Sequence, residues 1–454
     1  MVGHVVASAR AVGAERIVVV VGVGADQVRA YLDGQAEFVL QAEQLGTGHA
    51  LMQAESALAE AEGTLLVLYG DAPLLTPEVL QELLSAHRQN RTVATVLAAV
   101  VPDPTGYGRV IRTADGSLER IVEEADASSA ERAICEINTG IYCLELQGIR
   151  DLTGASHGLF DVLRRLRNNN AQQEYYLTDL NLIMAEMGQR VGIATVASTD
   201  WVLFPNSRRQ LAEAEAIYRR RILNHWMDEG VTIVDPNSTY IDAGVQIGRD
   251  TTVWPGTFLQ GTTIVGERCD IGPNTRVAAS QIGNAVRIEM SVVEQSTVGD
   301  GCHIGPYAHL RPRCVLGRGV ELGNFAEAKN TVFGDGVKCH HHSYLGDTEI
   351  GPRANIGAGV ITANYDGYNK HRTRIGQQAF IGTNVNLVAP IVVGEGALVG
   401  AGSTLTKDVP ADALAVERAS QVIKPGYANL MRERARRRSQ PAPAEKSSST
   451  EHGS

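Results

Sequence analysis

The sequence predicts a two-part protein, an α/β domain followed by a parallel β-helix, and two observations lead to this fold class. Strand and helix signals alternate over the first 200 or so residues, and apolar residues then recur every six positions from about residue 231 to 409. The six-residue period runs through Ile247, Val253, Leu259, Val265, Ile271 and Val277, and again through Ile375, Ile381, Leu387, Val393, Val399 and Leu405. Repeats this short cannot bury an apolar face alone, so they must stack into a solenoid.

Residues 1–205 are expected to form the α/β domain. Strand candidates are Ile17–Val21, Phe38–Leu40, Thr64–Tyr69 and Val93–Val100, and helices fit at Gly48–Ala61 and Thr76–His87. Alternating strands and helices predict a mostly parallel sheet, with ligands at the carboxyl ends of its strands.

Two motifs lie at those strand ends. The glycine turn in QAEQLGTGHA would let backbone amides approach an anion or a base edge, although such a turn is also an ordinary connection. In LYGDAPLL, Asp71 stands just past a buried strand, where it either holds a divalent ion or caps the next helix.

A connecting helix is expected within residues 206–230. An apolar stripe predicts it from Ser207 to Asp228 and consists of Leu211, Ala214, Tyr218, Ile222 and Trp226. The solenoid domain then covers 231–425. The tail, 426–454, is low in complexity and predicted to be disordered, and its arginines from 432 to 438 either contact polyanions or are simply solvated.

Two features of the solenoid indicate more than a structural rod. The period breaks between Ile361 and Ile375, so the segment TANYDGYNKHRTR must leave the coil as a loop, and loops on solenoids carry specific groups. Three consecutive histidines, 340–342, precede it. Strand alternation predicts that His341 faces away from the other two.

Arg311 and Lys329 lie eighteen residues apart, which is three repeats of six. We therefore expect them to stack on one face in adjacent coils. Two aligned cations can clamp a phosphate, and ordinary surface charge is the alternative.

The composition excludes several classes of partner. The net charge of -10 argues against nucleic acid, because phosphate backbones need a basic surface. The six cysteines show no CxxC pair, which fits a reducing cytoplasm. No apolar run reaches the roughly 18 residues of a membrane span. We expect a cytoplasmic protein with neither nucleic-acid nor membrane partners.

Taken together, these motifs resemble a known family. QAEQLGTGHA, LYGDAPLL, DPTGYGRV, EINTG and NNNAQQEYYLTD are similar to the sugar-nucleotidyltransferase domain of the bacterial bifunctional enzymes that make UDP-N-acetylglucosamine. LRPR, the histidine run and NIGAGVITANYDG resemble the acetyltransferase domain of the same enzymes. The resemblance spans residues 1 to about 425. It implies a Rossmann-like nucleotidyltransferase domain followed by a left-handed parallel β-helix of hexapeptide repeats.

The resemblance implies two reactions. Acetyl-CoA would acetylate glucosamine 1-phosphate, and UTP would then uridylylate N-acetylglucosamine 1-phosphate with release of pyrophosphate. A homotrimer and a magnesium ion held by Asp71 and Asn206 are also implied. The implied contacts to UDP-N-acetylglucosamine are Gln41, Gly46, Thr47, Tyr69, Gly70, Asp71, Gly108, Glu123, Asn138 and Asn206.

In the acetyltransferase domain the resemblance makes His341 the general base. The implied contacts to the sugar phosphate are Arg311, Lys329, Tyr344 and Asn355. The implied contacts to acetyl-CoA are Ala358, Asn364, Tyr365, Thr383, Ala401 and Arg418.

Some positions depart from the family pattern. The family's Gly-Thr-Arg phosphate loop and its lysine have no counterpart in this sequence, so we expect weak or absent uridylyl transfer and a true start upstream of Met1. Thr383 replaces a common serine, and Asn206 follows Pro205 where the family has valine.

Two rival classes stay open. One is an acetyltransferase, or a regulatory protein, whose nucleotidyltransferase domain is inactive. The other is a trimeric solenoid zinc hydratase that uses histidines such as His303 and His309 as ligands.

Overall fold

The structure, a computed structural model, describes residues 1–196 and 199–438. The chain divides into two compact units, Met1–Arg221 and a second that begins at Ile222. The division falls inside helix α9 (Arg208–Asp228), which forms where the connecting helix was predicted. Ala214 of this helix is buried in a core of the first unit, and Leu223 in the core of the second.

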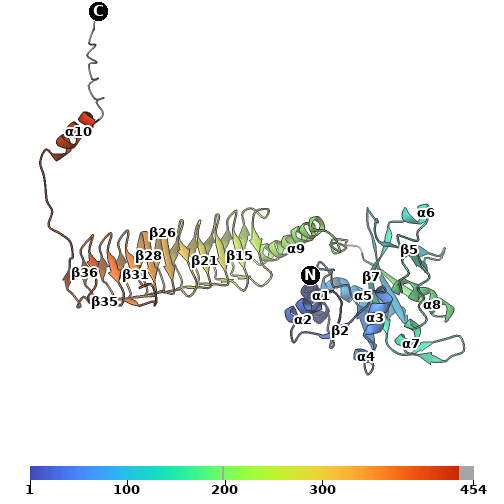
Figure 1. The fold of residues 1–454 in the computed structure, drawn as a ribbon. Helices are drawn as coiled ribbons and strands as arrows, with labels where there is room; N and C mark the ends of the chain where they lie inside the picture. The colour runs from blue at the N-terminus through green and yellow to red at the C-terminus, as the bar shows by residue number, and fades with distance from the viewer. Residues whose placement is uncertain (197–198, 439–454) are drawn as a thin grey trace, which may run out of the picture. The chain divides into compact units, whose positions relative to one another are not determined.

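The first unit is an α/β domain (Figure 1). Its helices are α1 (Val2–Ala11), α2 (Ala25–Tyr31), α3 (Thr47–Gln53), α4 (Glu55–Leu58), α5 (Pro77–Asn90), α6 (Ser129–Arg132), α7 (Leu159–Leu163), the 3-10 turn η1 (Leu177–Asp179) and α8 (Leu180–Glu186). Its strands are β1 (Val18–Val21), β2 (Glu37–Leu40), β3 (Thr64–Val67), β4 (Ala94–Val100), β5 (Gly108–Arg112), β6 (Leu118–Val122), β7 (Glu136–Glu145), β8 (Ile149–Arg150), β9 (Ser156–His157) and β10 (Val191–Val196).

The central sheet has the order β10-β4-β7-β5-β6, and β3 also pairs with β7. Here the sequence prediction needs correction, because the pairing is not mostly parallel. Strands β10 and β4 are parallel, as are β1 and β2 in a separate sheet, but β7 runs antiparallel to β3, β4 and β5. Strands β5 and β6 form a hairpin, since their connection is too short for a parallel crossover. Its turn contains Asp115-Gly116, a dipeptide that favours hairpin turns.

The two faces of this sheet are covered by separate apolar cores. Leu97 and Ala99 of β4 belong to one core, with Leu80 and Leu83 of α5. Ala94 and Val96 of the same strand belong to the other, with residues of α7 and α8. Alternate residues of β4 thus face opposite sides, and both sides are buried, as expected of a sheet with helices on each face.

The second unit is the predicted parallel β-helix (Figure 1). One sheet contains β11 (Thr232–Ile233), β12 (Tyr240–Ile241), β14 (Thr252–Val253), β15 (Phe258–Gln260), β17 (Asp270–Ile271), β18 (Arg276–Ala278), β20 (Arg287–Ile288), β21 (Val292–Glu294), β23 (His303–Ile304), β24 (His309–Leu310), β26 (Glu321–Lys329), β28 (Lys338–Gly346), β30 (Asn355–Ile356), β31 (Ile361–Ala363), β33 (Phe380–Ile381), β34 (Asn386–Val388), β36 (Leu398–Val399), β37 (Thr404–Leu405) and β38 (Leu414–Ala415). The other contains β13 (Gln246–Ile247), β16 (Ile264–Val265), β19 (Gln281–Ile282), β22 (Thr297–Val298), β25 (Val315–Leu316), β27 (Val332–Phe333), β29 (Thr348–Ile350), β32 (Thr373–Ile375) and β35 (Ile391–Val393).

The six-residue period corresponds to the buried side of these strands. In most two-residue strands the first residue is exposed or half-buried and the second is buried, as in Gln246 and Ile247. Val253 pairs with Ile271 on the next coil, so one coil takes up three six-residue repeats. The buried residues form one continuous core.

The six-residue period breaks at the position predicted from the sequence. Strand β31 ends at Ala363 and β32 begins at Thr373, so residues 364–372 form a loop outside the coil. The loop closes on itself through an isolated bridge between Tyr365 and Lys370, and through the Asp366 carboxylate, which accepts from His371 Nε2 at 2.7 Å.

The end of the chain differs from the prediction. Tyr427–Arg438 forms helix α10 rather than a disordered segment. The run has neither proline nor glycine and is rich in arginine, with two alanines, and both residue types favour helices. The rest of the predicted tail, 439–454, lies outside the described residues. None of the helices described is long and apolar enough to cross a membrane.

Candidate active sites

The glycine turn after β2 is held against a distant segment of the first unit. Tyr175 N donates to Leu45 O, and Gly48 N donates to Tyr175 O, both at 2.8 Å. Within the turn, Gln41 Nε2 donates to Gly46 O at 3.3 Å. The Thr47 hydroxyl accepts from Leu177 N at 3.1 Å. The turn is therefore fixed in place and is not a loose connection.

Tyr69 links this turn to the central sheet. Its hydroxyl meets Thr47, and its ring lies so close to Gly140 of β7 that a Cβ there would come within 1.8 Å of the ring. Gly140 has φ of +73°, a conformation that suits glycine. Burial first, and then the charge of Glu123, raise the pKa of Tyr69 to about 12. This hydroxyl is therefore a hydrogen-bond donor at neutral pH.

Three further predicted residues meet beside Gly140. Gly108 pairs with Asn138 in the β5/β7 ladder, and a Cβ at Gly108 would lie 3.3 Å from the Glu123 carboxylate. Asn138 Oδ1 accepts from Gly140 N at 3.0 Å. Glu123 accepts from the Thr178 hydroxyl at 3.0 Å, and burial raises the pKa of this carboxyl. The structure thus joins residues from five separate motifs into one polar patch.

The two expected magnesium ligands lie on segments that touch. Phe204 packs edge-on against Tyr69, with ring centroids 6.2 Å apart, so the chain leading to Asn206 runs beside the turn that holds Gly70 and Asp71. Neither residue is a helix cap. Thr76 is the N-cap of α5, and at the start of α9 Ser207 accepts from Gln210 N.

The side chains of Asp71 and Asn206 suit a magnesium site in which water and phosphate supply the remaining ligands. A carboxylate and an amide supply only oxygen donors, which Mg²⁺ prefers, and an ion held by two protein groups keeps room for water and phosphate oxygens. Among residues 1–196 and 199–438 there is no group of three or more histidines, cysteines or carboxylates placed to hold a metal.

In the solenoid, His341 of β28 lines a cavity of about 700 Å³. The lining residues come from five successive coils. The remaining lining residues are His340, Asn355, Ile356, Gly357, Ala358, Phe380, Gly382, Thr383, Leu398, Val399, Gly400, Ala401 and Leu414. Arg418 reaches the rim, where its Nη1 donates to Ala401 O at 2.9 Å. The cavity therefore places an imidazole beside a lining that is largely apolar.

The histidine run does not alternate as predicted. His340, His341 and His342 are all exposed, and both His340 and His341 line the cavity. Strand β28 is nine residues long and contributes to two faces of the coil, so simple alternation fails along it. His340 is held by Glu321, with Nε2 2.6 Å from Oε2.

A second group, outside this cavity in the part of the chain described, contains the predicted phosphate ligands. Leu310 pairs with Ala328, so Arg311 and Lys329 follow on one face of adjacent coils, as their spacing predicted. The positive charge of Lys370, and then that of Arg311, lower the pKa of Lys329. Lys370 belongs to the loop 364–372 and was missed, because a residue outside the repeat cannot be placed by its period. These cations form a basic cluster.

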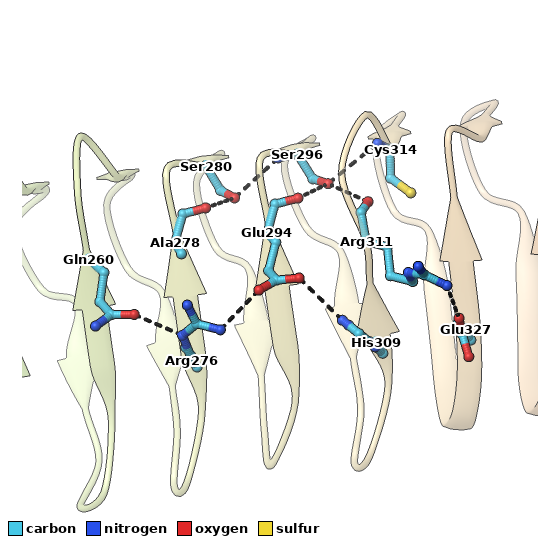
Figure 2. A network of polar contacts seen from close by, with 10 residues as sticks. All are labelled: Gln260, Arg276, Ala278, Ser280, Glu294, Ser296, His309, Arg311, Cys314 and Glu327. Carbon is cyan, nitrogen blue, oxygen red and sulfur yellow. Dashed lines mark hydrogen bonds and ion pairs between the residues drawn. The ribbon is translucent and has the colours of Figure 1, made fainter.

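Figure 2 shows how Arg311 is set on the solenoid face. A ladder of polar side chains, one to a coil, runs from Gln260 through Arg276 and Glu294 to His309. Arg311 follows and pairs with Glu327, Nη1 to Oε1 at 3.0 Å. The pair engages one guanidinium nitrogen, which leaves other N–H groups for an anion.

Tyr344 and Asn364 meet over Gly346, the residue that pairs with Lys329 on the next coil. A Cβ at Gly346 would lie 2.7 Å from both the Tyr344 hydroxyl and Asn364 Nδ2. Tyr365 follows Asn364 and is exposed on the loop. Two polar tips thus stand next to the cations.

Comparison with known proteins agrees with this organisation. Residues 1–224 match the MobA-like NTP transferase domain, 237–364 the GMPPB C-terminal domain, and 372–407 the bacterial transferase hexapeptide (six repeats). The fold and sites define a two-domain protein in which a nucleotidyltransferase domain precedes a hexapeptide-repeat transferase.

Similar proteins identify the family to which this two-domain chain belongs. The chain is 48% identical over 431 residues to the bifunctional protein GlmU of Geobacillus sp. (strain WCH70), covering 95% of this chain and 92% of the relative. It is 49% identical over 442 residues to bifunctional protein GlmU of Symbiobacterium thermophilum, covering 96% and 92%. The chain belongs to the bifunctional GlmU family.

Proposed function

We propose that this chain makes UDP-N-acetylglucosamine in two steps, one in each unit. The solenoid transfers an acetyl group from acetyl-CoA to glucosamine 1-phosphate, and the α/β unit then joins the product to the uridylyl group of UTP, releasing pyrophosphate. We expect the second step to be weak in this chain, because its sequence has no counterpart of the family's Gly-Thr-Arg phosphate loop. The rival zinc hydratase function loses support, because the two histidines that it would use as ligands each pair with a carboxylate. His303 lies 3.5 Å from Glu289, and His309 3.4 Å from Glu294.

The observation that carries the acetyl-transfer proposal is the cavity that His341 lines. Its apolar wall, with Phe380, Leu398 and Leu414, suits the extended arm of a coenzyme, and Thr383 and Ala401 lie along it. Arg418 at the rim would meet coenzyme phosphates. In the reaction the sugar amine attacks the thioester carbonyl, His341 removes the ammonium proton, the C–N bond forms, and the C–S bond breaks to release the thiolate, which takes up a proton.

The basic cluster supplies the positive charge that would bind the phosphate of glucosamine 1-phosphate. Arg311, Lys329 and Lys370 would hold the sugar phosphate, and Tyr344 would meet the ring. The resemblance assigns Asn364 to acetyl-CoA, but because it lies beside Tyr344 at Gly346 we propose that it meets the sugar instead. Asn355 lines the cavity near His341 and could reach the same sugar. The cluster and the cavity do not share lining residues in the described chain, which supports our proposal that the site is completed by a neighbouring copy in a homotrimer.

In the first unit, the polar patch from Gln41 to Glu123 would bind the nucleotide and the amino sugar. Asp71 and Asn206 would hold Mg²⁺, which when bound neutralises phosphate charge. Glu123, Asn138 and the amide of Gly108 offer hydrogen-bonding groups to sugar hydroxyls.

The test is thiol release from acetyl-CoA by the full chain. Thiol should appear only when glucosamine 1-phosphate is present, and N-acetylglucosamine 1-phosphate should accumulate in equal amount. A folded chain that releases no thiol would overturn the acetyl-transfer proposal. Adding UTP and Mg²⁺ tests the second step through pyrophosphate release, and light scattering during size exclusion tests the trimer by its mass.

A further inference from the structure

Asp347 sits between two asparagines that lie one coil away on either side. Asn330 Nδ2 donates to Oδ1 of Asp347, and Asn364 Nδ2 donates to Oδ2 at 2.6 Å. The backbone is tied to the same coils, since Asp347 N donates to Lys329 O at 3.0 Å and Thr373 N donates to Asp347 O at 3.3 Å. The carboxylate is therefore clamped, with each oxygen assigned to one amide.

A carboxylate decides which way an amide points. An asparagine side chain can exchange its oxygen and nitrogen by a half-turn, and only its partner distinguishes the two orientations. An ionised carboxylate accepts hydrogen bonds and cannot donate them, so it requires the nitrogen of Asn364. Asn364 is only 6% exposed, so a reversed amide would set its oxygen against the carboxylate with little water to relieve the contact.

The carbonyl oxygen of Asn364 consequently points away from Asp347. The amide nitrogen of Asn364 lies beside the Tyr344 hydroxyl over Gly346, with Lys329 on the preceding coil, and the oxygen of the same amide group is the acceptor left for a ligand in this region. An acceptor suits a ligand with N–H groups. The proposed acceptor substrate has such a group, its amine, and a phosphate that the nearby cations would hold.

We propose that Asp347 is a positioning residue of the acetyl-transfer site, which keeps the Asn364 carbonyl oxygen turned toward the amine of the amino sugar. The inference rests on the proposed function. An amine that donates an N–H to this oxygen has its lone pair directed elsewhere, free to attack the thioester. A reversed amide would instead face the amine with N–H groups, two donors against a donor, and would hold the amine poorly.

The test measures thiol release and compares four variants with the wild type. D347A removes the acceptor that fixes Asn364, and kcat/KM for glucosamine 1-phosphate should fall roughly 10- to 100-fold, the loss expected for a hydrogen bond to a charged group. KM for acetyl-CoA should stay unchanged. N330A is the matched control: it removes the other hydrogen bond on the same carboxylate and leaves Asn364 held, so kcat/KM should stay within about threefold.

The double variant D347N/N330D provides the rescue. The carboxylate moved to position 330 takes the new amide nitrogen at 347, whose oxygen then still accepts from Asn364, so activity should return to near the wild-type value. D347N alone should show a loss of at least about twofold, since one of the two neighbouring amides must then reverse. If D347A does not fold, the comparison of D347N with D347N/N330D decides in its place.

The outcomes separate this inference from the proposed function. If D347A loses no more activity than N330A, or if D347N/N330D is as impaired as D347N, Asp347 does not act through the Asn364 amide and the inference is overturned. If the wild type itself releases no thiol with glucosamine 1-phosphate, the proposed function fails as well. A fall in thermal stability alone, with kcat/KM unchanged, also counts against the positioning role.

Discussion

Replacing Gly140 with alanine tests how the first unit holds Tyr69. Gly140 has φ of +73°, and a Cβ at this position would lie 1.8 Å from Cε2 of Tyr69 and 2.6 Å from Cζ. Ordinary van der Waals contact begins at 3.4 Å, so the ring has to retreat. The substitution therefore combines backbone strain with the displacement of a residue that we place in the nucleotide site.

The size of the effect follows from these two parts. A left-handed backbone costs a non-glycine residue about 1–2 kcal/mol. Retreat of Tyr69 weakens its edge-on contact with Phe204, at 6.2 Å between centroids, which is worth about 0.5–1.5 kcal/mol. Together they amount to about 1.5–3.5 kcal/mol. For a unit of about 220 residues each kcal/mol lowers Tm by about 2–4 °C, so we expect a fall of about 3–14 °C.

The assay is differential scanning calorimetry of the full chain, in which the unfolding of the first unit is followed separately from that of the solenoid. G148A is the control, because Gly148 has φ of +80° and no atom within 4 Å of an added Cβ. It carries the backbone strain alone and should cost about 1–2 kcal/mol. If the two variants lose the same stability, and both still bind UDP-N-acetylglucosamine like the wild type, the argument about Tyr69 is refuted.

Three further predictions concern single side chains. H341A should lower kcat for acetyl transfer about 10²- to 10⁴-fold, the usual contribution of a general base, with an unchanged Tm because the side chain is exposed; retained turnover would remove His341 from that role. K370A should raise KM for glucosamine 1-phosphate about tenfold and leave KM for acetyl-CoA unchanged. It should also raise the pKa of Lys329 toward its usual value, which NMR titration can follow, since Lys370 is the largest cause of the lowering. E123Q should make the first unit more stable at pH 8. Because burial raises the pKa of Glu123 above 4.5, the wild type loses stability as pH rises through that raised pKa, and the difference between the two proteins should vanish below pH 4.5.

The solenoid was predictable because its periodic pattern reports burial directly. Each buried residue of a coil recurs at a fixed interval, and this interval also placed Arg311 beside Lys329. The period cannot place residues that leave the repeat. Lys370 reaches Lys329 from a loop, and no spacing rule connects the two.

The first unit shows a different limit. Strands β1 to β4 were predicted within a few residues, because short apolar runs identify them, but β5 to β10 were not predicted. The direction of each strand also depends on which partner it meets. Strand β7 is antiparallel to three neighbours, and no short turn joins it to any of them. The Asp115-Gly116 turn gives a local sign only of the β5/β6 hairpin. The polar patch around Glu123 likewise needs contacts among five distant motifs, which single-sequence reasoning reached only through resemblance.

The regular repeat of the β-helix restricts which insertions and deletions it can accept. Val253 and Ile271 occupy the same place on consecutive turns. Inserting or removing one residue inside a strand would exchange inward and outward side chains from that point on, so apolar groups would meet water and charged groups the interior. Adding or deleting a whole turn keeps this frame, because every buried position stays buried. The excursion at 364–372 is already outside that frame, which makes it the natural place where the polypeptide can gain or lose single residues without disturbing the turns that follow.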